Sequence, residues 1–206
     1  SMPKKGTLYT VSAPSGAGKT SLVNALLKKT SGLHASVSHT TRAMRPGEKE
    51  GVDYYFVNQA AFLSLVDEQA FLEHAQVFNH FYGTSQKWVQ QTLLSGADVI
   101  LEIDWQGAAQ IRRLLSDCIS IFVLPPSLNA LEERLTSRGQ DASAVIKRRL
   151  SAAKEEISHF KEADYLIIND GFSEALDDIG SIILSKRLKL PRQEQKYLSL
   201  LKDLLS

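Results

Sequence analysis

A glycine-rich segment near the N-terminus, residues 13–20, constrains this chain more than any other stretch. It reads Ala-Pro-Ser-Gly-Ala-Gly-Lys-Thr. A short, mostly apolar segment with strand-forming residues precedes it at 7–12, and leucines at helical spacing follow it at 21–29. The order of strand, glycine-rich turn and helix is the context that a phosphate-binding loop needs. The usual motif begins with Gly where this chain has Ala13, so a glycine-rich turn before an ordinary helix is the alternative.

The residue types inside this segment suit the binding of phosphate groups. Gly16 and Gly18 lack a Cβ atom, so the turn can direct successive backbone N–H groups at one anion. The helix that begins near Lys19 adds unpaired N–H groups and the positive end of its dipole. The Lys19 side chain can reach the terminal phosphates of a nucleotide, and the Thr20 hydroxyl can ligate Mg²⁺. The segment therefore predicts a nucleoside triphosphate site.

The composition fits one compact globular domain. The chain has 206 residues, of which 43% are hydrophobic and 23% are charged, so its core can be sizeable. The single cysteine, Cys118, lies in an apolar run and predicts a buried thiol in a reducing, cytosolic setting. No run approaches the about 18 apolar residues of a membrane span, and we expect no signal peptide before the first strand. A net charge of +1 argues against a general nucleic-acid binder.

Helical spacing and alternating apolar residues predict an α/β chain. After 7–12, strands are expected at 51–57, 71–78, 98–104, 118–124 and 165–169, with a short one inside 36–48 and a turn at 79–84. Helices are expected at 21–29, 59–66, 85–94, 127–138, 143–160 and 172–189, with another beginning at 105. The polar, leucine-containing tail at 191–206 has room for one more short helix.

Two arginines on an irregular segment, Arg42 and Arg45, form the first candidate anion site after the loop. Their planar guanidinium groups can clamp a phosphate or carboxylate. A solvated basic loop is the alternative, because runs of charge usually lie at the surface. The whole block from 35 to 84 has the pattern of an insertion between a core helix and the next core strand.

Two carboxylates stand at positions that favour a role in a site. Glu73 shares one face of its predicted strand with Phe71 and Ala75, which is the wrong side for a merely solvated acid. Asp104 ends an apolar strand, and ligands of open α/β sheets lie at the carboxyl ends of strands. Asp104 also precedes a helical segment, so it can serve as a helix N-cap instead or as well.

Arginines converge from two predicted helices between 127 and 160. Arg134 and Arg138 are four residues apart and share a face. Gly139 breaks the pattern, and the second helix carries Arg149 within a Lys-Arg-Arg run. A helix, a turn and a helix with facing arginines predict a mobile lid over a polyanion. A charged helical hairpin with ordinary pairing is the alternative.

Taken together in this order, these segments resemble bacterial guanylate kinases from about residue 7 to 186. The motifs that carry the resemblance are Ser-Ala-Pro-Ser-Gly-Ala-Gly-Lys-Thr at 12–20, Ser-His-Thr-Thr-Arg at 38–42, Arg-Pro-Gly-Glu at 45–48, Gly-Val-Asp-Tyr at 51–54, Phe-Leu-Glu at 71–73, Tyr-Gly-Thr at 82–84, Glu-Ile-Asp-Trp-Gln-Gly at 102–107, Pro-Pro-Ser at 125–127, Arg-Leu-Thr-Ser-Arg-Gly at 134–139 and Ile-Asn-Asp at 168–170. Several of these motifs are weak alone, but their joint order is highly specific. The bacterial members of the family commonly have Ala at the place of Ala13.

The resemblance implies a single domain with a P-loop NTPase three-layer α/β fold and a mostly parallel sheet. The core would comprise 7–34, 85–125 and 158–206. A mixed α/β subdomain that binds GMP would span 35–84, and a helical lid would span 126–157. The implied reaction is the transfer of the ATP γ-phosphoryl group to GMP with Mg²⁺, in the cytoplasm, without a nucleic-acid or membrane partner. A homo-oligomer is left open.

The resemblance also assigns residues to each ligand. The catalytic set would be Lys19, Arg42, Arg134, Arg138 and Arg149. The ATP phosphates would lie on Ala13, Pro14, Ser15, Gly16, Ala17, Gly18, Lys19 and Thr20, with Thr20 on the metal and Asn169 near adenine. GMP would contact Ser38, Arg42, Arg45, Glu48, Tyr54, Glu73, Tyr82, Thr84, Glu102 and Asp104. Within this set Arg42, Arg45, Tyr54 and Tyr82 would take the phosphate, and Glu73, Ser38, Thr84 and Asp104 the guanine. Glu102 stands where some relatives carry Asp, which leaves its direct role open.

Two other functions fit parts of the pattern. Some guanylate-kinase-like domains bind phosphoprotein partners without catalysis, but they typically lack an intact phosphate loop. A related kinase that acts on a phosphorylated sugar would not need Ser38, Glu73 and Thr84, which suit a guanine base.

Overall fold

The computed structural model describes residues 5–136 and 142–206. Within these residues, five strands form a sheet in which each neighbouring pair is parallel, in the order β2-β7-β1-β8-β9. The strands are β1 (Leu8–Ser12), β2 (Leu33–Ala35), β7 (Asp98–Glu102), β8 (Ile119–Leu124) and β9 (Tyr165–Ile168). All five residues of β1 are buried, as expected of a strand that is covered on both faces. Its carboxyl end therefore places the glycine-rich segment at the middle of the sheet edge.

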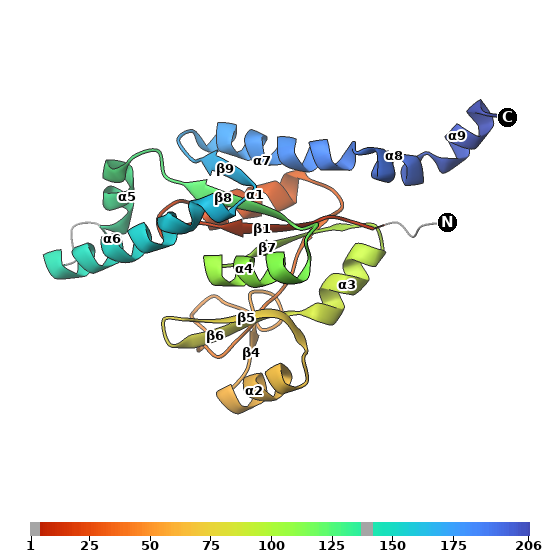
Figure 1. Cartoon of the computed structure of the whole chain (residues 1–206). Helices are drawn as coiled ribbons and strands as arrows, with labels where there is room; N and C mark the ends of the chain where they lie inside the picture. The colour runs from red at the N-terminus through yellow and green to blue at the C-terminus, as the bar shows by residue number, and fades with distance from the viewer. Residues whose placement is uncertain (1–4, 137–141) are drawn as a thin grey trace.

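Helices cover both faces of this sheet and make it the middle of three layers (Figure 1). On one face lie α1 (Lys19–Lys29) and α7 (Phe172–Arg187), and on the other lie α3 (Gln86–Leu94) and α4 (Trp105–Leu114). Each pair of helices closes its own apolar core. One core contains Val11, Leu22, Leu26, Ile121, Ile179 and Ile183, and the other contains Val89, Leu93, Val99, Leu101 and Ile111. The predicted three-layer α/β fold is confirmed.

A second, mixed sheet lies beyond α4 (Figure 1). Its order is β4-β3-β6-β5, with β4 (Tyr55–Phe56), β3 (His39–Thr40), β6 (His80–Ser85) and β5 (Phe71–Val77). β3 runs parallel to β4 and antiparallel to β6. Helix α2 (Gln59–Asp67) packs on this sheet through Phe62, which is fully buried. This sheet and α2 correspond to the insertion expected at 35–84.

The segment expected to form a lid contains α5 (Leu128–Leu135), α6 (Ser143–Ile157) and the short 3₁₀ helix η1 (Ser158–Glu162). A small apolar cluster, Leu131, Leu135 and Ala153, joins α5 to α6. The C-terminal end of α6 continues into η1, where the His159 ring stacks on the Trp105 ring of α4. The ring centroids are 3.5 Å apart and the angle between the ring planes is 7°, so this contact fixes the end of the segment to the core. The first-turn N–H groups of α5 are capped by the Ser127 hydroxyl, which accepts a hydrogen bond from the Ala130 N–H at 3.0 Å.

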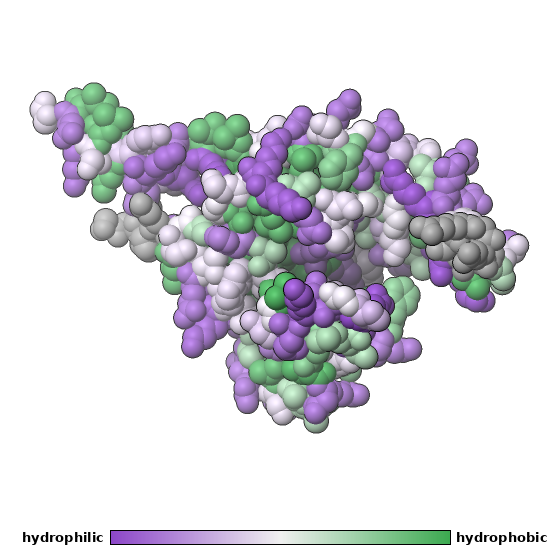
Figure 2. All heavy atoms as spheres, turned by 180° about the vertical axis from the view of Figure 1, so that it is seen from behind, coloured by the Kyte–Doolittle hydropathy of each residue, from purple (hydrophilic) through white to green (hydrophobic). Residues whose placement is uncertain are grey.

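The chain ends in an arm made of α8 (Leu190–Lys196) and α9 (Leu198–Leu204), which extends away from the layers (Figure 1). No residue of either helix is buried. The base of the arm is anchored, because the buried Asp98 carboxylate accepts hydrogen bonds from Arg192 at 2.6 Å and from Arg187 at 2.8 Å. In the view from behind, apolar side chains gather at the far end of the arm (Figure 2).

Several sequence-based element boundaries are wrong. The expected turn at 79–84 is strand β6, because the hairpin closes with only two residues, Phe78 and Asn79, both at positive φ. The expected strand at 51–57 shrinks to β4, because Gly51 (φ 75°) belongs to a turn. Strand β2 was not expected, and the tail forms two helices instead of one. α5 ends at Leu135, three residues before the expected end, and Arg138 lies outside the described residues.

Candidate functional site

The glycine-rich segment has the backbone geometry of a phosphate-binding loop. It leaves β1 at Ser12 and enters α1 at Lys19. Gly16 (φ 87°) and Gly18 (φ 82°) take the left-handed conformation that favours glycine. Gly18 is also the N-cap of α1, so the first N–H groups of the helix point into the loop. Ala13 is buried, and Ala17 donates its N–H to the Pro14 carbonyl at 3.3 Å, so the Ala in place of Gly leaves the turn intact.

Two side chains brace the loop from outside. Asn169, at the end of β9, donates its Nδ2 hydrogen to the Ala17 carbonyl at 2.8 Å and is almost fully buried. A Cβ atom at position 18 would lie 2.6 Å from the same Nδ2 atom, so only glycine fits there. Arg134 of α5 donates to the Gly16 carbonyl at 3.3 Å. Asn169 therefore supports the loop in this structure, and its predicted contact with adenine stays a prediction.

An oxygen pair suited to magnesium lies where β7 meets the loop. β7 pairs with β1 so that Glu102 lies opposite Val11, and the Thr20 hydroxyl donates a hydrogen bond to the Glu102 carboxylate. Among the residues described, no three His, Cys, Asp or Glu side chains form a metal site. One hydroxyl and one carboxylate fit Mg²⁺, which usually keeps several waters and takes phosphate oxygens as further ligands. This contact places Glu102 beside Thr20. The sequence-based prediction had instead assigned Glu102 to GMP.

The acid expected to read guanine is buried in the mixed sheet. Glu73 is 4% exposed, and the Thr84 hydroxyl on the neighbouring strand donates to its Oε1 atom at 2.6 Å. Burial, with a smaller contribution from the nearby Asp104 carboxylate, raises the pKa of Glu73 to about 7, although the hydrogen bond from Thr84 opposes the rise. No described group donates a hydrogen bond to the other oxygen, Oε2. A Cβ atom at Gly107 would lie only 2.7 Å from Oε2, so the glycine keeps room beside this oxygen.

Asp104 connects this pocket to the phosphate loop. Its Oδ1 atom caps α4 by accepting a hydrogen bond from the Gly107 N–H at 2.9 Å. Burial raises its pKa, while the Gly107 N–H and the Lys19 ammonium oppose the rise. The charge of Asp104 thus contributes to the raised pKa of Glu73, and the charge of Lys19 limits the rise in the pKa of Asp104. The N-cap alternative is confirmed, and the contact of Asp104 with substrate stays a prediction.

Arg42 is held in place before any ligand binds. Its Nη1 and Nη2 atoms donate to the two carboxylate oxygens of Glu48 at 2.9 and 2.7 Å. This bidentate pair raises the pKa of Arg42 and lowers that of Glu48. The guanidinium also lies 5.1 Å from the centre of the Tyr54 ring, and Tyr54 packs against Tyr82 at 6.0 Å. Arg42 is buried, so the alternative of a solvated basic loop is wrong for this residue.

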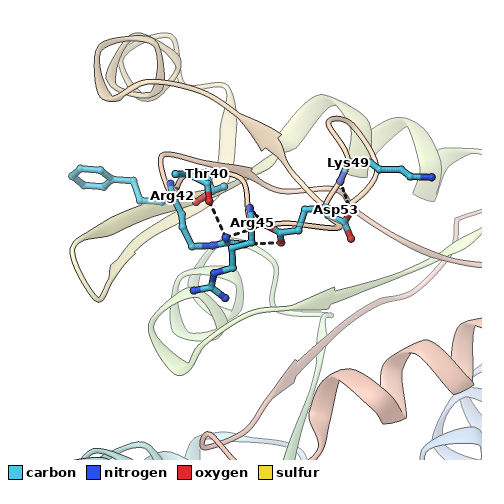
Figure 3. A network of polar contacts seen from close by, with 8 residues as sticks. Thr40, Arg42, Arg45, Lys49 and Asp53 are labelled. Atoms are coloured by element: carbon cyan, nitrogen blue, oxygen red, sulfur yellow. Dashed lines mark hydrogen bonds and ion pairs between the residues drawn. The ribbon is translucent and has the colours of Figure 1, made fainter.

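Thr40 and Arg45 lie next to Arg42 in the same network of polar contacts (Figure 3). The Arg45 backbone N–H donates to Glu48 at 2.8 Å, which closes the loop around the ion pair. The Thr40 hydroxyl accepts a hydrogen bond from the backbone N–H of Arg42 at 3.1 Å. Ser38 precedes β3, and its carbonyl accepts the Tyr55 N–H at 2.9 Å. In this structure Glu48 binds Arg42, so its direct contact with GMP stays a prediction.

Two arginines of the predicted lid line a cavity of about 560 Å³ beside the loop. Arg134 and Arg149 line it together with Ser15 and Gly16. Arg149 is exposed and donates to the Leu135 carbonyl at 3.1 Å. The structure therefore brings these two arginines to the rim of the phosphate loop, while Arg138 lies outside the described residues.

Sequence reasoning missed one acid at this rim. Glu156 of α6 lines the same cavity, and burial raises its pKa, while a hydrogen bond from the Ser15 backbone and the charge of Lys19 oppose the rise. The sequence did carry a signal for this acid: Glu156 stands eight residues after Arg148, which places both side chains on one face of the helix.

Comparisons with known proteins agree with this geometry. The family model described as guanylate kinase matches residues 5–186. The guanylate kinase of Saccharophagus degradans is 60% identical over 205 residues, which cover 100% of both chains. That of Hahella chejuensis is 55% identical over 202 residues, which cover 98% of this chain and 97% of the relative.

A solved structure gives the same result. The crystal structure of guanylate kinase from Anaplasma phagocytophilum matches with a TM-score of 0.76 and 36% identity, over 93% of this chain and 92% of that one. Together with the phosphate loop, the buried Glu73 and the paired Arg42, these matches show that the chain belongs to the guanylate kinase family.

Proposed function

We propose that this chain transfers the γ-phosphoryl group of ATP to GMP, giving ADP and GDP. The observation that carries the proposal is the position of Asp104: it caps α4 at Gly107, beside which the Glu73 carboxylate lies, and it follows β7, the parallel neighbour of the strand that leads into the loop and Lys19. A site for guanine and a site for nucleoside triphosphate are thereby parts of one arrangement. The family relatives are named guanylate kinases, which agrees with this assignment.

The reaction requires positioning and charge stabilisation more than covalent chemistry by the protein. An oxygen of the GMP phosphate bonds to the γ-phosphorus, and the bond from that phosphorus to the bridging oxygen of ADP breaks. The two polyanions repel each other unless cations lie between them. Lys19 at the start of α1 would supply such a charge on the ATP side and Arg42, held by Glu48, on the GMP side, while Arg134 and Arg149 line the cavity next to the loop.

Magnesium fits the oxygen pair at the loop. Thr20 and Glu102 would hold the ion, directly or through water, beside the phosphates. The bound ion would neutralise phosphate charge. Lys19 and the backbone N–H groups of the loop orient the same phosphates.

A coupled assay of ADP release tests the proposal. Purified protein is supplied with ATP and Mg²⁺ and, in turn, with GMP, AMP, CMP, UMP or a pentose bisphosphate. GMP should give the fastest turnover, and chelation of magnesium should abolish it. Binding of GMP without ADP release would favour a non-catalytic binding module, and turnover with the sugar phosphate alone would favour the related sugar kinase.

The partner and setting are part of the same proposal. Among the residues described, no helix has the length and apolarity to cross a membrane. We propose a cytoplasmic setting, which the free, buried Cys118 supports. We also propose that two copies associate through the arm, because it carries exposed leucines on an anchored base: Leu190, Leu198, Leu200, Leu201, Leu204 and Leu205. Sedimentation should give a dimer that Leu201→Asp dissociates, whereas a monomer at all concentrations would contradict association.

A further inference from the structure

The closed end of the β5–β6 hairpin presents an aromatic side chain that the mechanism above does not use. Phe78 is 78% exposed, and its backbone φ is +50°. A type I′ turn needs positive φ at both central residues and normally has Asn or Gly there. A bulky residue in this conformation is unfavourable. An exposed ring at a strained corner adds nothing to the stability of the hairpin, which points to a contact made in another state of the molecule.

The ring faces the lid and the phosphate loop. Phe78 lines the cavity of about 560 Å³ that Ser15, Gly16 and Arg134 also line. In Figure 1 the closed end of the hairpin lies on the side of the molecule that carries α6. Three parts of the chain that are distant in sequence, the loop, the hairpin and the lid, therefore border one space.

Helix α6 offers a surface that fits an aromatic ring. Arg148, Ala152 and Glu156 all line the cavity, and their spacing of four residues places them on one face of the helix. Ala152 is exposed and small, and it lies between the two longer side chains. A ring laid on Ala152 would contact the aliphatic stem of Arg148 and leave its guanidinium over the ring face, a favourable cation–π geometry.

We infer that Phe78 is a positioning residue that seals the transfer site against water. When the lid approaches the mixed sheet, the Phe78 ring packs on Ala152 and Arg148 and closes the outer end of the cavity. This role rests on the proposed phosphoryl transfer and refines it, because it concerns which acceptor the γ-phosphoryl group reaches. Lid closure is the step at which kinases generally exclude water.

Water is the competing acceptor. Its oxygen would bond to the γ-phosphorus while the bond to the bridging oxygen of ADP breaks, and its protons would pass to phosphate and solvent. The products are ADP and inorganic phosphate instead of ADP and GDP. Burial of one Phe side chain favours the closed contact by roughly 10- to 100-fold. Loss of the ring should therefore raise the share of hydrolysis by about tenfold.

The test measures inorganic phosphate and GDP in the same reaction with saturating ATP, Mg²⁺ and GMP. Phe78→Ala and Phe78→Gly should both raise the ratio of phosphate to GDP by about tenfold, and Phe78→Leu should fall between them and the wild type. The glycine variant suits positive φ, so it removes the ring without straining the turn. The midpoint temperature of thermal unfolding of Phe78→Ala and of Phe78→Gly should equal or exceed that of the wild type. A raised ratio in the alanine variant alone would assign the effect to turn geometry and overturn the role of the ring.

A second site and a control sharpen the result. Ala152→Asp should raise the ratio in the wild type but add little in Phe78→Ala, because both changes remove the same contact. Leu63→Ala truncates another exposed apolar side chain, on α2 and away from the cavity lining, and should leave the ratio unchanged. If the wild type forms no GDP, the proposed function fails. If it forms GDP with a ratio that Phe78→Ala does not change, only the inference about Phe78 fails.

Discussion

The proposed guanine pocket and the proposed lid of this protein are built in opposite ways. In the pocket, Glu73 and Thr84 are 4% and 0% exposed and hydrogen-bonded to each other. In the lid segment, Arg134 and Arg149 are exposed. Arg134 donates a hydrogen bond to the Gly16 carbonyl at 3.3 Å, and Arg149 donates one to the Leu135 carbonyl at 3.1 Å. The pocket is therefore arranged before a ligand arrives, whereas the lid arginines still have to turn toward the phosphates.

This difference divides the two tasks of the enzyme. A rigid, buried carboxylate discriminates between bases, because a wrong base leaves it unpaired. Exposed arginines add little to binding in water but much to a closed transition state from which water is excluded. Changes in the pocket should alter substrate preference, and changes in the lid should alter turnover. The four predictions below test this division, and the first concerns the loop that both regions face.

The largest effect is expected at Lys19. Lys19→Met removes a compact charge that follows the phosphoryl group as it moves, so kcat should fall by roughly 10²- to 10³-fold. The fold should survive, because the side chain serves the ligand. The measurement is steady-state turnover with thermal unfolding alongside. Lys28→Met, on the exposed end of the same helix, is the matched control and should keep wild-type turnover.

The next largest effect concerns base choice at Glu73. Guanine offers two adjacent donors, N1–H and the 2-amino group, and a carboxylate offers two acceptors. Glu73→Gln directs a donor at a donor, so GMP should bind about 1–3 kcal/mol more weakly. The preference for GMP over AMP should narrow in kcat/KM. Glu68→Gln, an exposed acid of the same subdomain, is the control. Equal loss for both nucleotides would mean that Glu73 supports the fold and that guanine is read elsewhere.

A smaller effect is expected in the lid. Arg149→Ala removes one charge-assisted hydrogen bond in the closed state, so kcat should fall roughly 10- to 30-fold. The dissociation constant of GMP should barely change, since the guanine pocket is untouched. Lys147→Ala, two residues away on α6, is the control. A large loss of GMP affinity with unchanged single-turnover chemistry would break the proposed division between pocket and lid.

The sequence predicted the chemistry of the loop because local rules determine it. A strand, two glycines and a helix start fix the geometry of residues 13–20, and the structure has them as expected. Glu73 is buried as expected, but the predicted face shared with Phe71 is wrong, because a bulge between Phe71 and Glu73 breaks the strand alternation. Phe71 packs on Phe62 of α2, whereas the Glu73 carboxylate lies beside Gly107 of α4. The prediction for the loop needed only neighbours in sequence, and the bulge left no local signal.

Contacts between distant segments escaped prediction. The pairing of Thr20 with Glu102 depends on the parallel register of β1 and β7, which no local pattern reveals. Strand β6 was read as a turn, because a type I′ turn at Phe78 and Asn79 lacks the usual glycine. The hydrogen bond from Asn169 to the loop depends on the pairing of β1 with β8 and of β8 with β9, which brings the end of β9 next to the loop. Register and turn type are set by tertiary pairing, and the sequence carries only weak signals for them.

The smallest expected effect is a pH dependence that belongs to the pocket and not to the lid. Burial raises the pKa of Glu73 to about 7 in the free protein, so the carboxyl group is mostly protonated at pH 6 and mostly ionised at pH 8. Only the ionised form accepts both guanine donors, so kcat/KM for GMP should rise by about tenfold between these pH values. Because bound GMP favours the ionised carboxylate, kcat should change much less over the same range. The phosphate of GMP also titrates near pH 6, and Glu73→Gln keeps that contribution while it removes the carboxyl group. The difference between the two pH profiles therefore isolates Glu73, and Arg149→Ala should show the wild-type profile at lower kcat. Parallel profiles for wild type and Glu73→Gln would contradict a titrating acid in the guanine pocket.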